Sequence, residues 1–276
     1  MRHRFTAPRA DRLDRLIADN TALSRKRAKL LIKRGGVHVD GKQARFESTT
    51  VSAGAIVEVR TNAVSSRGRA DLVLPDRYRE AGILVVDKPA GLPSQSTRQG
   101  HRQHLYGALQ AREDYVGLHH RLDTPASGLV LLTLERALNR AISEAFQDGS
   151  IHRSYLLAVI GDPGASGHWS APIDGRRAST RWTRLAHDGH ASILSATLET
   201  GRTHQIRRHA AEAGFPILGD RRYGGAAGRA WERLSLHAHQ LRFLHPRLNR
   251  SVTVESPIPD DLSLLFEQIG YPPEEE

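Results

Sequence analysis

The chain has 276 residues, enough for one large domain or for a large domain with a small appendage. It contains no cysteine, which excludes disulfides, thiolate metal sites, iron–sulfur clusters and cysteine nucleophiles. The net charge of +10 lies at the start, because residues 1–69 hold 16 Lys and Arg against 6 Asp and Glu, while the remaining 24 of each balance. Such a basic segment favours a polyanionic partner, of which nucleic acid is the most common in a cytoplasm.

The sequence gives no sign of a membrane segment. It has no run of about 18 apolar residues. Its first residues also lack the apolar stretch of a secretory signal. We therefore expect a cytoplasmic protein without membrane association.

The first 60 residues predict a small domain of two helices and short strands. Leucine and isoleucine recur at helical spacing within 11–20, and Ser24 can cap a second helix that stops at Gly35-Gly36. A strand at 37–39, a turn at Asp40-Gly41 and further strands within 51–59 follow. The second helix can turn its apolar side to a core, and its opposite side carries four cations, Arg25, Lys26, Lys29 and Lys33.

This order of elements resembles the small RNA-binding domain named after ribosomal small-subunit protein four. The resemblance covers about residues 9–60 and implies that the four cations of the second helix bind RNA. The alternative is a small α+β appendage whose charges only keep it in solution.

A second, larger domain is expected after a linker. Residues 61–74 are rich in serine and arginine and have no clear period, so we interpret 1–60 as the first domain, 61–74 as the linker and 75–276 as the second domain. Short apolar runs predict buried strands at 83–86, 129–132 and 155–160, and residues 135–146 have one apolar helical face. Strands and helices alternate without a strict βαβ rhythm. The predicted class is α+β, with a mixed, mainly antiparallel sheet flanked by helices.

Three polar segments of the second domain stand out. The first is the loop 117–128, which contains His-Arg-Leu-Asp at 120–123 and precedes an apolar strand. Alone, Asp123 followed by Thr-Pro is most simply a turn residue. The second segment, 200–209, combines three arginines and two histidines at the apparent start of a helix, which suits an anion. The third, 235–246, begins with strand-like alternation.

Together these segments resemble the RluA-type family of pseudouridine synthases. His-Arg-Leu-Asp followed by Ser127-Gly128 is similar to the family's catalytic motif. Asp-Lys-Pro-Ala-Gly-Leu at 87–92, Arg-Ser-Tyr-Leu at 153–156 and Gly-Arg-Thr-His-Gln-Ile-Arg at 201–207 match further blocks in the family's order. The chain departs from the pattern at Ala126, where threonine is usual, and at Thr124, where a charged residue is frequent.

The resemblance implies a role for each matching residue. Asp123 would be the catalytic carboxylate, Tyr155 would stack on the flipped uracil and assist a proton step, and Arg207 would pair with Asp123. Arg121 would fill the gap that the flipped nucleotide leaves. The complete set of expected RNA-binding residues is Arg121, His120, Arg202, His204, Arg25, Lys26, Lys29 and Lys33.

The chemistry requires neither cofactor nor metal. Turning uridine into pseudouridine breaks a carbon–nitrogen bond, rotates the released base and rejoins it through ring carbon five, without exchange of electrons or atoms with a partner. We therefore expect no cofactor, no metal and RNA as the partner of a monomeric enzyme. Ribosomal RNA is favoured by the first domain, and transfer RNA is the alternative.

Two rival interpretations stay open on the sequence alone. Histidine pairs at 119–120, at 204 and 209 and at 237 and 239 are compatible with a metal site, although no carboxylate lies at ligand spacing. A non-catalytic RNA-binding protein would share the basic first domain. It would not account for the matching catalytic blocks.

Overall fold

The computed structural model describes residues 2–21, 23–33, 36–44, 46–60, 74–96, 103–229 and 231–272. The chain forms two compact units, Met1–Leu72 and Val73–Glu276. The expected linker, 61–74, lies outside the described residues except for Leu74.

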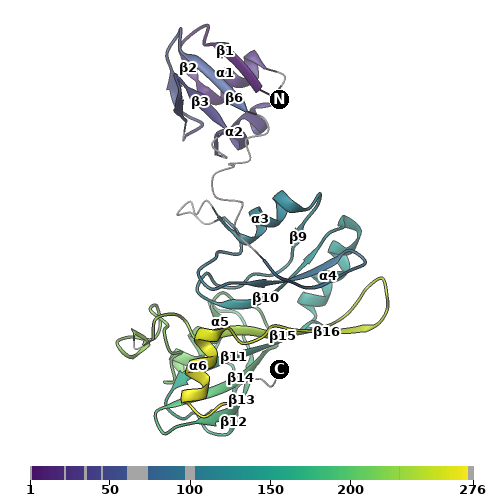
Figure 1. Ribbon diagram of the computed structural model, residues 1–276, viewed down its shortest axis with the longest axis vertical. Helices are drawn as coiled ribbons and strands as arrows, with labels where there is room; N and C mark the ends of the chain where they lie inside the picture. Colours follow the sequence, from purple (N-terminus) through teal and green to yellow (C-terminus); the bar gives the residue numbers. More distant parts are fainter. Residues whose placement is uncertain are drawn as a thin grey trace. The chain divides into compact units, whose positions relative to one another are not determined.

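The first unit combines two helices with short antiparallel strands (Figure 1). A four-stranded sheet has the order β1-β6-β3-β4, and β2 pairs with β5. The elements are β1 (Arg2–Thr6), β2 (Asp11–Arg12), α1 (Leu13–Asn20), α2 (Arg25–Lys33), β3 (Val37–Val39), β4 (Lys42–Gln43), β5 (Thr50–Val51) and β6 (Ile56–Arg60).

Helix α2 is built as the sequence predicts. The Ala28 amide donates to the Ser24 carbonyl, and the Gly36 amide donates to the carbonyl of Leu31 at the other end. Ala28, Leu31 and Ile32 are buried in a core that also contains Leu16 and Ile17 of α1. The apolar face of α2 thus holds the unit together.

Turn chemistry determines the β3–β4 hairpin. Asp40 and Gly41 both have positive φ, 48° and 76°, and Val39 pairs with Lys42 across them. Asp-Gly is a favoured sequence for such a two-residue turn. Strand β1, in contrast, was not expected, because Phe5 is the only apolar side chain in Arg-His-Arg-Phe-Thr; within the described residues it lies at the edge of the sheet, next to β6.

The second unit is built on a mixed, mainly antiparallel ten-stranded sheet flanked by helices, which confirms the predicted class. The strand order is β12-β13-β14-β11-β15-β10-β8-β7, with β16 beside β15 and β9 beside β10. The strands are β7 (Asp76–Glu80), β8 (Ile83–Lys88), β9 (Gly117–Leu118), β10 (Ser127–Thr133), β11 (His152–Ile160), β12 (Ser166–Trp169), β13 (Thr180–His187), β14 (Ala191–Leu198), β15 (Leu236–Leu244) and β16 (Ser251–Glu255). The helical segments are α3 (Leu105–Arg112), η1 (Arg136–Leu138), α4 (Asn139–Gln147), α5 (Gln205–Glu212), η2 (Ala227–Arg229) and α6 (Asp260–Gln268).

Two helices cover different parts of this sheet. Ile142 of α4 packs in a buried cluster with residues of β8, β10 and β15. Leu262, Leu265 and Phe266 of α6 pack against residues of β11 and β14. Figure 1 shows where α6 lies on the sheet. The apolar face predicted at 135–146 is therefore used, although it is divided between the short turn η1 and α4.

One parallel pair, β10 with β15, lies next to the loop of interest. Gly128 pairs with Ala238 and has φ of 111°. A Cβ atom at Gly128 would lie 2.3 Å from the carbonyl oxygen of Ala238. Glycine is therefore required for β10 to approach β15, and this approach places the preceding loop beside the centre of the sheet.

Candidate active site

Asp123 lies in the loop that leads into β10, and its neighbours hold the loop in place. The Ser94 hydroxyl donates to the carbonyl of Leu122 at 2.8 Å and accepts from the Leu122 amide at 3.0 Å. The carbonyl of Thr124 accepts from the Gly91 amide at 2.8 Å. The backbone on both sides of Asp123 is thus bound to Gly91, within the family match at 87–92, and to Ser94, just beyond it.

Lys88 reinforces this attachment from inside the protein. Its side chain is fully buried, and Nζ donates to the carbonyls of Leu92, Ala126 and Pro89 at 2.8, 2.6 and 3.0 Å, with Thr124 at 3.3 Å. Burial lowers the pKa of Lys88 to about 7, and the negative charge of Asp123 acts in the opposite direction. Lys88 therefore connects the two loops that meet at Asp123.

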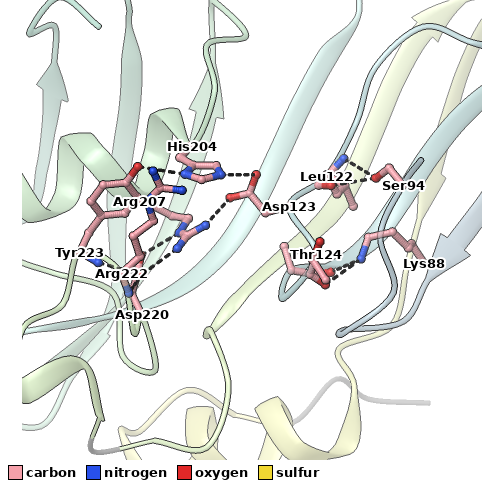
Figure 2. A network of polar contacts seen from close by, with 11 residues as sticks. Lys88, Ser94, Leu122, Asp123, Thr124, His204, Arg207, Asp220, Arg222 and Tyr223 are labelled. Atoms are coloured by element: carbon pink, nitrogen blue, oxygen red, sulfur yellow. Dashed lines mark hydrogen bonds and ion pairs between the residues drawn. The ribbon is translucent and has the colours of Figure 1, made fainter. Parts of the chain in front are cut away.

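Arg207, on α5, holds the Asp123 carboxylate directly. Its Nη1 donates to Asp123 Oδ2 at 2.9 Å, while Nε and Nη2 donate to the two oxygens of Asp220 at 2.8 Å each (Figure 2). The Arg207 side chain is 6% exposed and that of Asp220 is 1% exposed, whereas the Asp123 side chain is 21% exposed. The buried pair orients a carboxylate that is itself partly exposed.

Asp220 is kept ionised by its surroundings. Burial alone would raise its pKa, but hydrogen bonds from Arg207 and from the backbone amides of Tyr223 and Arg222 outweigh this effect and hold the pKa below its usual value. Arg207 also lies over the ring of Tyr223, with Cζ 5.1 Å from its centre. The guanidinium is therefore restrained on three sides.

His204 approaches the second oxygen of Asp123. Its Nε2 lies 3.7 Å from Asp123 Oδ1, and its Nδ1 is 2.9 Å from the Tyr223 hydroxyl (Figure 2). His204 has φ of 56°, a strained conformation that places it just before α5. Burial lowers the pKa of His204, the charge of Asp123 opposes this, and the nearby charge of Arg207 adds to it. At neutral pH the ring is therefore uncharged.

Tyr155 lies on β11 between two small residues. It pairs with Ala196 of β14 and with Ala238 of β15, and it is 7% exposed. Burial raises the pKa of Tyr155, and the negative charge of Asp123 adds to the rise. The phenol is therefore protonated at neutral pH, and alanines flank its ring in the sheet.

Comparisons with known proteins agree on one family. A family model described as RNA pseudouridylate synthase matches residues 82–212. Ribosomal large subunit pseudouridine synthase D of Xanthomonas campestris is 32% identical, with 88% of this chain and 84% of that protein covered. The chain belongs to the RNA pseudouridine synthases. It is an isomerase, and the resemblance to the RluA-type family is confirmed.

Further relatives extend the match. The protein of the same name from Zymomonas mobilis is 30% identical over 94% of this synthase and 93% of its own length. The solved structure of human RNA pseudouridylate synthase domain containing 1 covers 74% of this chain and 97% of its own, with a TM-score of 0.59 and 23% identity. This structural likeness supports the fold.

The expected RNA-binding residues of the synthase differ in their surroundings. Arg121 is exposed. Arg202 donates from Nε to the carbonyl of Arg177 at 3.0 Å. His120 accepts a hydrogen bond at Nε2 from the Leu131 amide at 2.8 Å, and its ring packs on Phe146; its contact with RNA stays a prediction. His120 thus has a structural role in holding β10.

The cations of α2 are only partly described. Arg25 and Lys29 are 49% and 41% exposed, and both approach Asp14, whose side chain is buried, at 3.0 and 3.8 Å. The side chains of Lys26 and Lys33 lie outside the described residues. Whether the four cations bind RNA stays a prediction.

The histidines do not form a metal centre in the part of the chain that the structure describes. Among those residues, no three His, Asp or Glu side chains are grouped as metal ligands. His209, for example, is bound to Thr180 and to the carbonyl of Ala171. Likewise, no helix among the described residues is long and apolar enough to cross a membrane.

Four residues of the site had no role predicted from the sequence, namely Lys88, Ser94, Asp220 and Tyr223. Lys88 lay within the family match at 87–92, whereas Asp220 lay outside the segments that stand out in the sequence. Their burial was not apparent from the sequence, because lysine and aspartate are rarely buried unless paired. The usable signal was a charged residue directly after an apolar strand, as in Val85-Val86-Asp87-Lys88.

Proposed function

We propose that this synthase isomerises uridines of large-subunit ribosomal RNA and that Asp123 is its catalytic carboxylate. The observation that carries the catalytic assignment is the arrangement of Asp220, Arg207 and Asp123, in which a buried ion pair orients a partly exposed carboxylate. The preference for ribosomal RNA is supported by the names of the relatives from Xanthomonas campestris and Zymomonas mobilis. It is also supported by the resemblance of residues 9–60 to a ribosomal-protein domain.

The proposed reaction divides the work among three side chains. Arg207 holds and orients Asp123 through its hydrogen bond, so that the carboxylate can act on the ribose or on the base of the extruded uridine. The bond between N1 and the sugar breaks, the uracil turns, and ring carbon five bonds to the sugar while its proton leaves and N1 gains a proton. Tyr155, protonated at neutral pH, stacks on the uracil and assists a proton step.

Binding and catalysis are proposed to be separate tasks. Arg121, being exposed, enters the space left by the flipped nucleotide. The first unit acts as an RNA-binding domain through Arg25, Lys26, Lys29 and Lys33. These cations supply attraction to the backbone rather than recognition of a base.

The decisive test substitutes the carboxylate alone. Asp123→Asn keeps the shape of the side chain, so RNA affinity should stay within twofold of the unchanged protein while pseudouridine formation falls below detection. Asp114→Asn, at an exposed aspartate outside the site, is the matched control and should retain full activity. Undiminished product from Asp123→Asn would refute the catalytic assignment.

The same preparation tests the substrate. Purified large-subunit ribosomal RNA and transfer RNA lacking pseudouridine are incubated with the enzyme, and pseudouridine is mapped at single-nucleotide resolution. We expect modification of ribosomal RNA. Pseudouridine in transfer RNA alone would refute the proposed ribosomal RNA substrate, while the proposed reaction would still stand.

A further inference from the structure

Arg153 is a buried cation without a counter-ion. It is 7% exposed, and its Nε has no hydrogen-bond partner. Among the residues that the structure describes, none forms an ion pair or hydrogen bond with its guanidinium; the contact present is with the ring of Phe146, 5.6 Å from Cζ. A buried charge left without a partner is costly, so its retention suggests that a ligand supplies the missing anion.

The guanidinium lies beside the catalytic residues. Arg153 is two positions before Tyr155 on β11, and residues two apart on a strand point to the same face. Burial lowers the pKa of His120 to about 3, and the charge of Arg153 lowers it further; the same charge opposes the rise in the pKa of Tyr155. The charge of Arg153 therefore acts on both rings.

An exposed glycine lies directly against this guanidinium. A Cβ atom at Gly201 would be 3.1 Å from Nη1 of Arg153, and Gly201 itself is exposed. The segment that begins at Gly201 continues to His204, which approaches Asp123. The charge thus lies just beneath the surface, at a loop that also lines the proposed active site.

We propose that Arg153 binds a phosphodiester group of the RNA strand at or next to the target uridine. This inference rests on the proposed catalytic site at Asp123. A guanidinium presents a fork of N–H donors that matches two phosphate oxygens, and one phosphate neutralises its charge. A uracil carbonyl would accept a hydrogen bond but leave the charge uncompensated, which makes phosphate the better partner. Arg153 then fixes the backbone while Tyr155 faces the base.

The first test uses the unaltered enzyme and a modified substrate. A short RNA containing the target uridine is prepared with single neutral methylphosphonate groups at each phosphate around that nucleotide. One substitution should weaken binding by about tenfold, as expected for a charge-assisted hydrogen bond. If none of the methylphosphonate groups weakens binding, the proposal is overturned. This result does not depend on the folding of any protein variant.

The second test connects that phosphate to Arg153. Arg153→Met should weaken binding of the unmodified RNA by a similar factor, yet show no further loss with the sensitive methylphosphonate, because both changes remove one contact. The slope of the logarithm of its binding constant against the logarithm of salt concentration should become shallower by about 0.7 to 0.9, the value for one phosphate contact. Arg153→Lys keeps the charge without the fork and should bind with intermediate affinity. Additive losses in the cycle would contradict the assignment.

The thermal stability of the free protein distinguishes phosphate binding by Arg153 from a role in packing alone. The free Arg153→Met protein should have an unchanged or higher Tm, because an unpaired buried charge is removed while an apolar chain still packs on Phe146. Arg140→Gln, at an 89% exposed arginine paired with Glu144, is the control and should alter neither Tm nor RNA binding. A lower Tm with unchanged affinity, or a loss of kcat alone, would overturn the proposal. If the unaltered enzyme binds RNA but forms no pseudouridine, the proposed function fails instead.

Discussion

The two units of this synthase use charge in opposite ways. In the first unit, Arg25 and Lys29 are nearly half-exposed and share one buried acid, Asp14. In the second, Arg207 and Lys88 are buried, and their N–H groups donate hydrogen bonds to specific oxygen atoms, such as the Asp123 carboxylate and the Ala126 carbonyl. Exposed charges attract a polyanion over a distance and are screened by salt, whereas buried ones fix atoms and are screened far less. The contrast predicts that the first unit contributes mainly affinity and the second mainly geometry.

We expect the largest effect from breaking the buried pair of Asp220 and Arg207 while leaving Asp123 unchanged. Asp220→Asn leaves Arg207 with one acid instead of two, and we expect about 3 kcal/mol of lost stability, or a Tm lower by roughly 6 to 12 °C. A small displacement of Asp123 should reduce kcat by about 100-fold. Thermal unfolding and single-turnover kinetics measure the two effects.

The adjacent arginine supplies the control for this experiment. Arg208 pairs with Asp174, whose side chain is 71% exposed, so Asp174→Asn should change stability by less than about 0.5 kcal/mol and leave kcat unaltered. Equal effects of the two substitutions would mean that burial does not distinguish these pairs.

The second effect tests the loop attachment. Lys88→Met removes the donor to carbonyls of both loops, and we expect about 2 kcal/mol of destabilisation together with a kcat lower by roughly tenfold, because Asp123 loses its support. RNA affinity should be unchanged, since Lys88 is fully buried. Lys42→Met, at an exposed lysine of the first unit, should leave both stability and kcat unchanged. A variant with lower affinity and normal kcat would show that Lys88 does not position the carboxylate.

The sequence predicted those parts of the fold that depend on local patterns. The apolar side of α2, the Asp40-Gly41 turn and the buried strands at 83–86, 129–132 and 155–160 follow from side-chain period and turn chemistry. Strand β1 was missed because an edge strand with one apolar residue has no such period. Local patterns are informative only where one face is buried.

The site was predictable only in part, and for a different reason. The contact between Arg207 and Asp123 joins residues 84 positions apart, and it was expected solely from the family resemblance. Asp220, Lys88 and the solitary Arg153 could not be inferred, because whether a charge is buried and paired depends on chain segments distant in sequence. His120 likewise has a contact that the sequence did not predict, since its ring accepts a hydrogen bond from the Leu131 amide of β10.

The third effect should appear in binding rather than catalysis. Replacing Arg25 and Lys29 together with glutamine removes two exposed charges, and we expect roughly tenfold weaker RNA binding and a logarithmic salt slope smaller by about 2. The kcat should not change. The control removes Arg140 and Arg250, which are exposed and paired in the second unit. If the control lowers affinity and salt slope as much, attraction is a property of the whole surface and the contrast between the units fails.

The smallest effect concerns Asp14, the acid that the exposed cations share. Burial acts to raise its pKa, but hydrogen bonds from Arg12 and Arg25 lower it to about 2, below the usual 3.8. A carboxyl whose folded pKa is depressed stabilises the fold above its unfolded pKa, and this stability is lost as the pH falls from about 4 to about 2. Asp14→Asn should therefore destabilise the first unit at pH 7 by about 1 kcal/mol, because its partners are half-exposed, and should have a much smaller effect at pH 2, where the folded-state carboxyl is partly protonated. Amide signals of residues 2–60 in NMR spectra of the full chain report the unfolding of this unit; an equal loss at both pH values would assign the role of Asp14 to packing instead of charge.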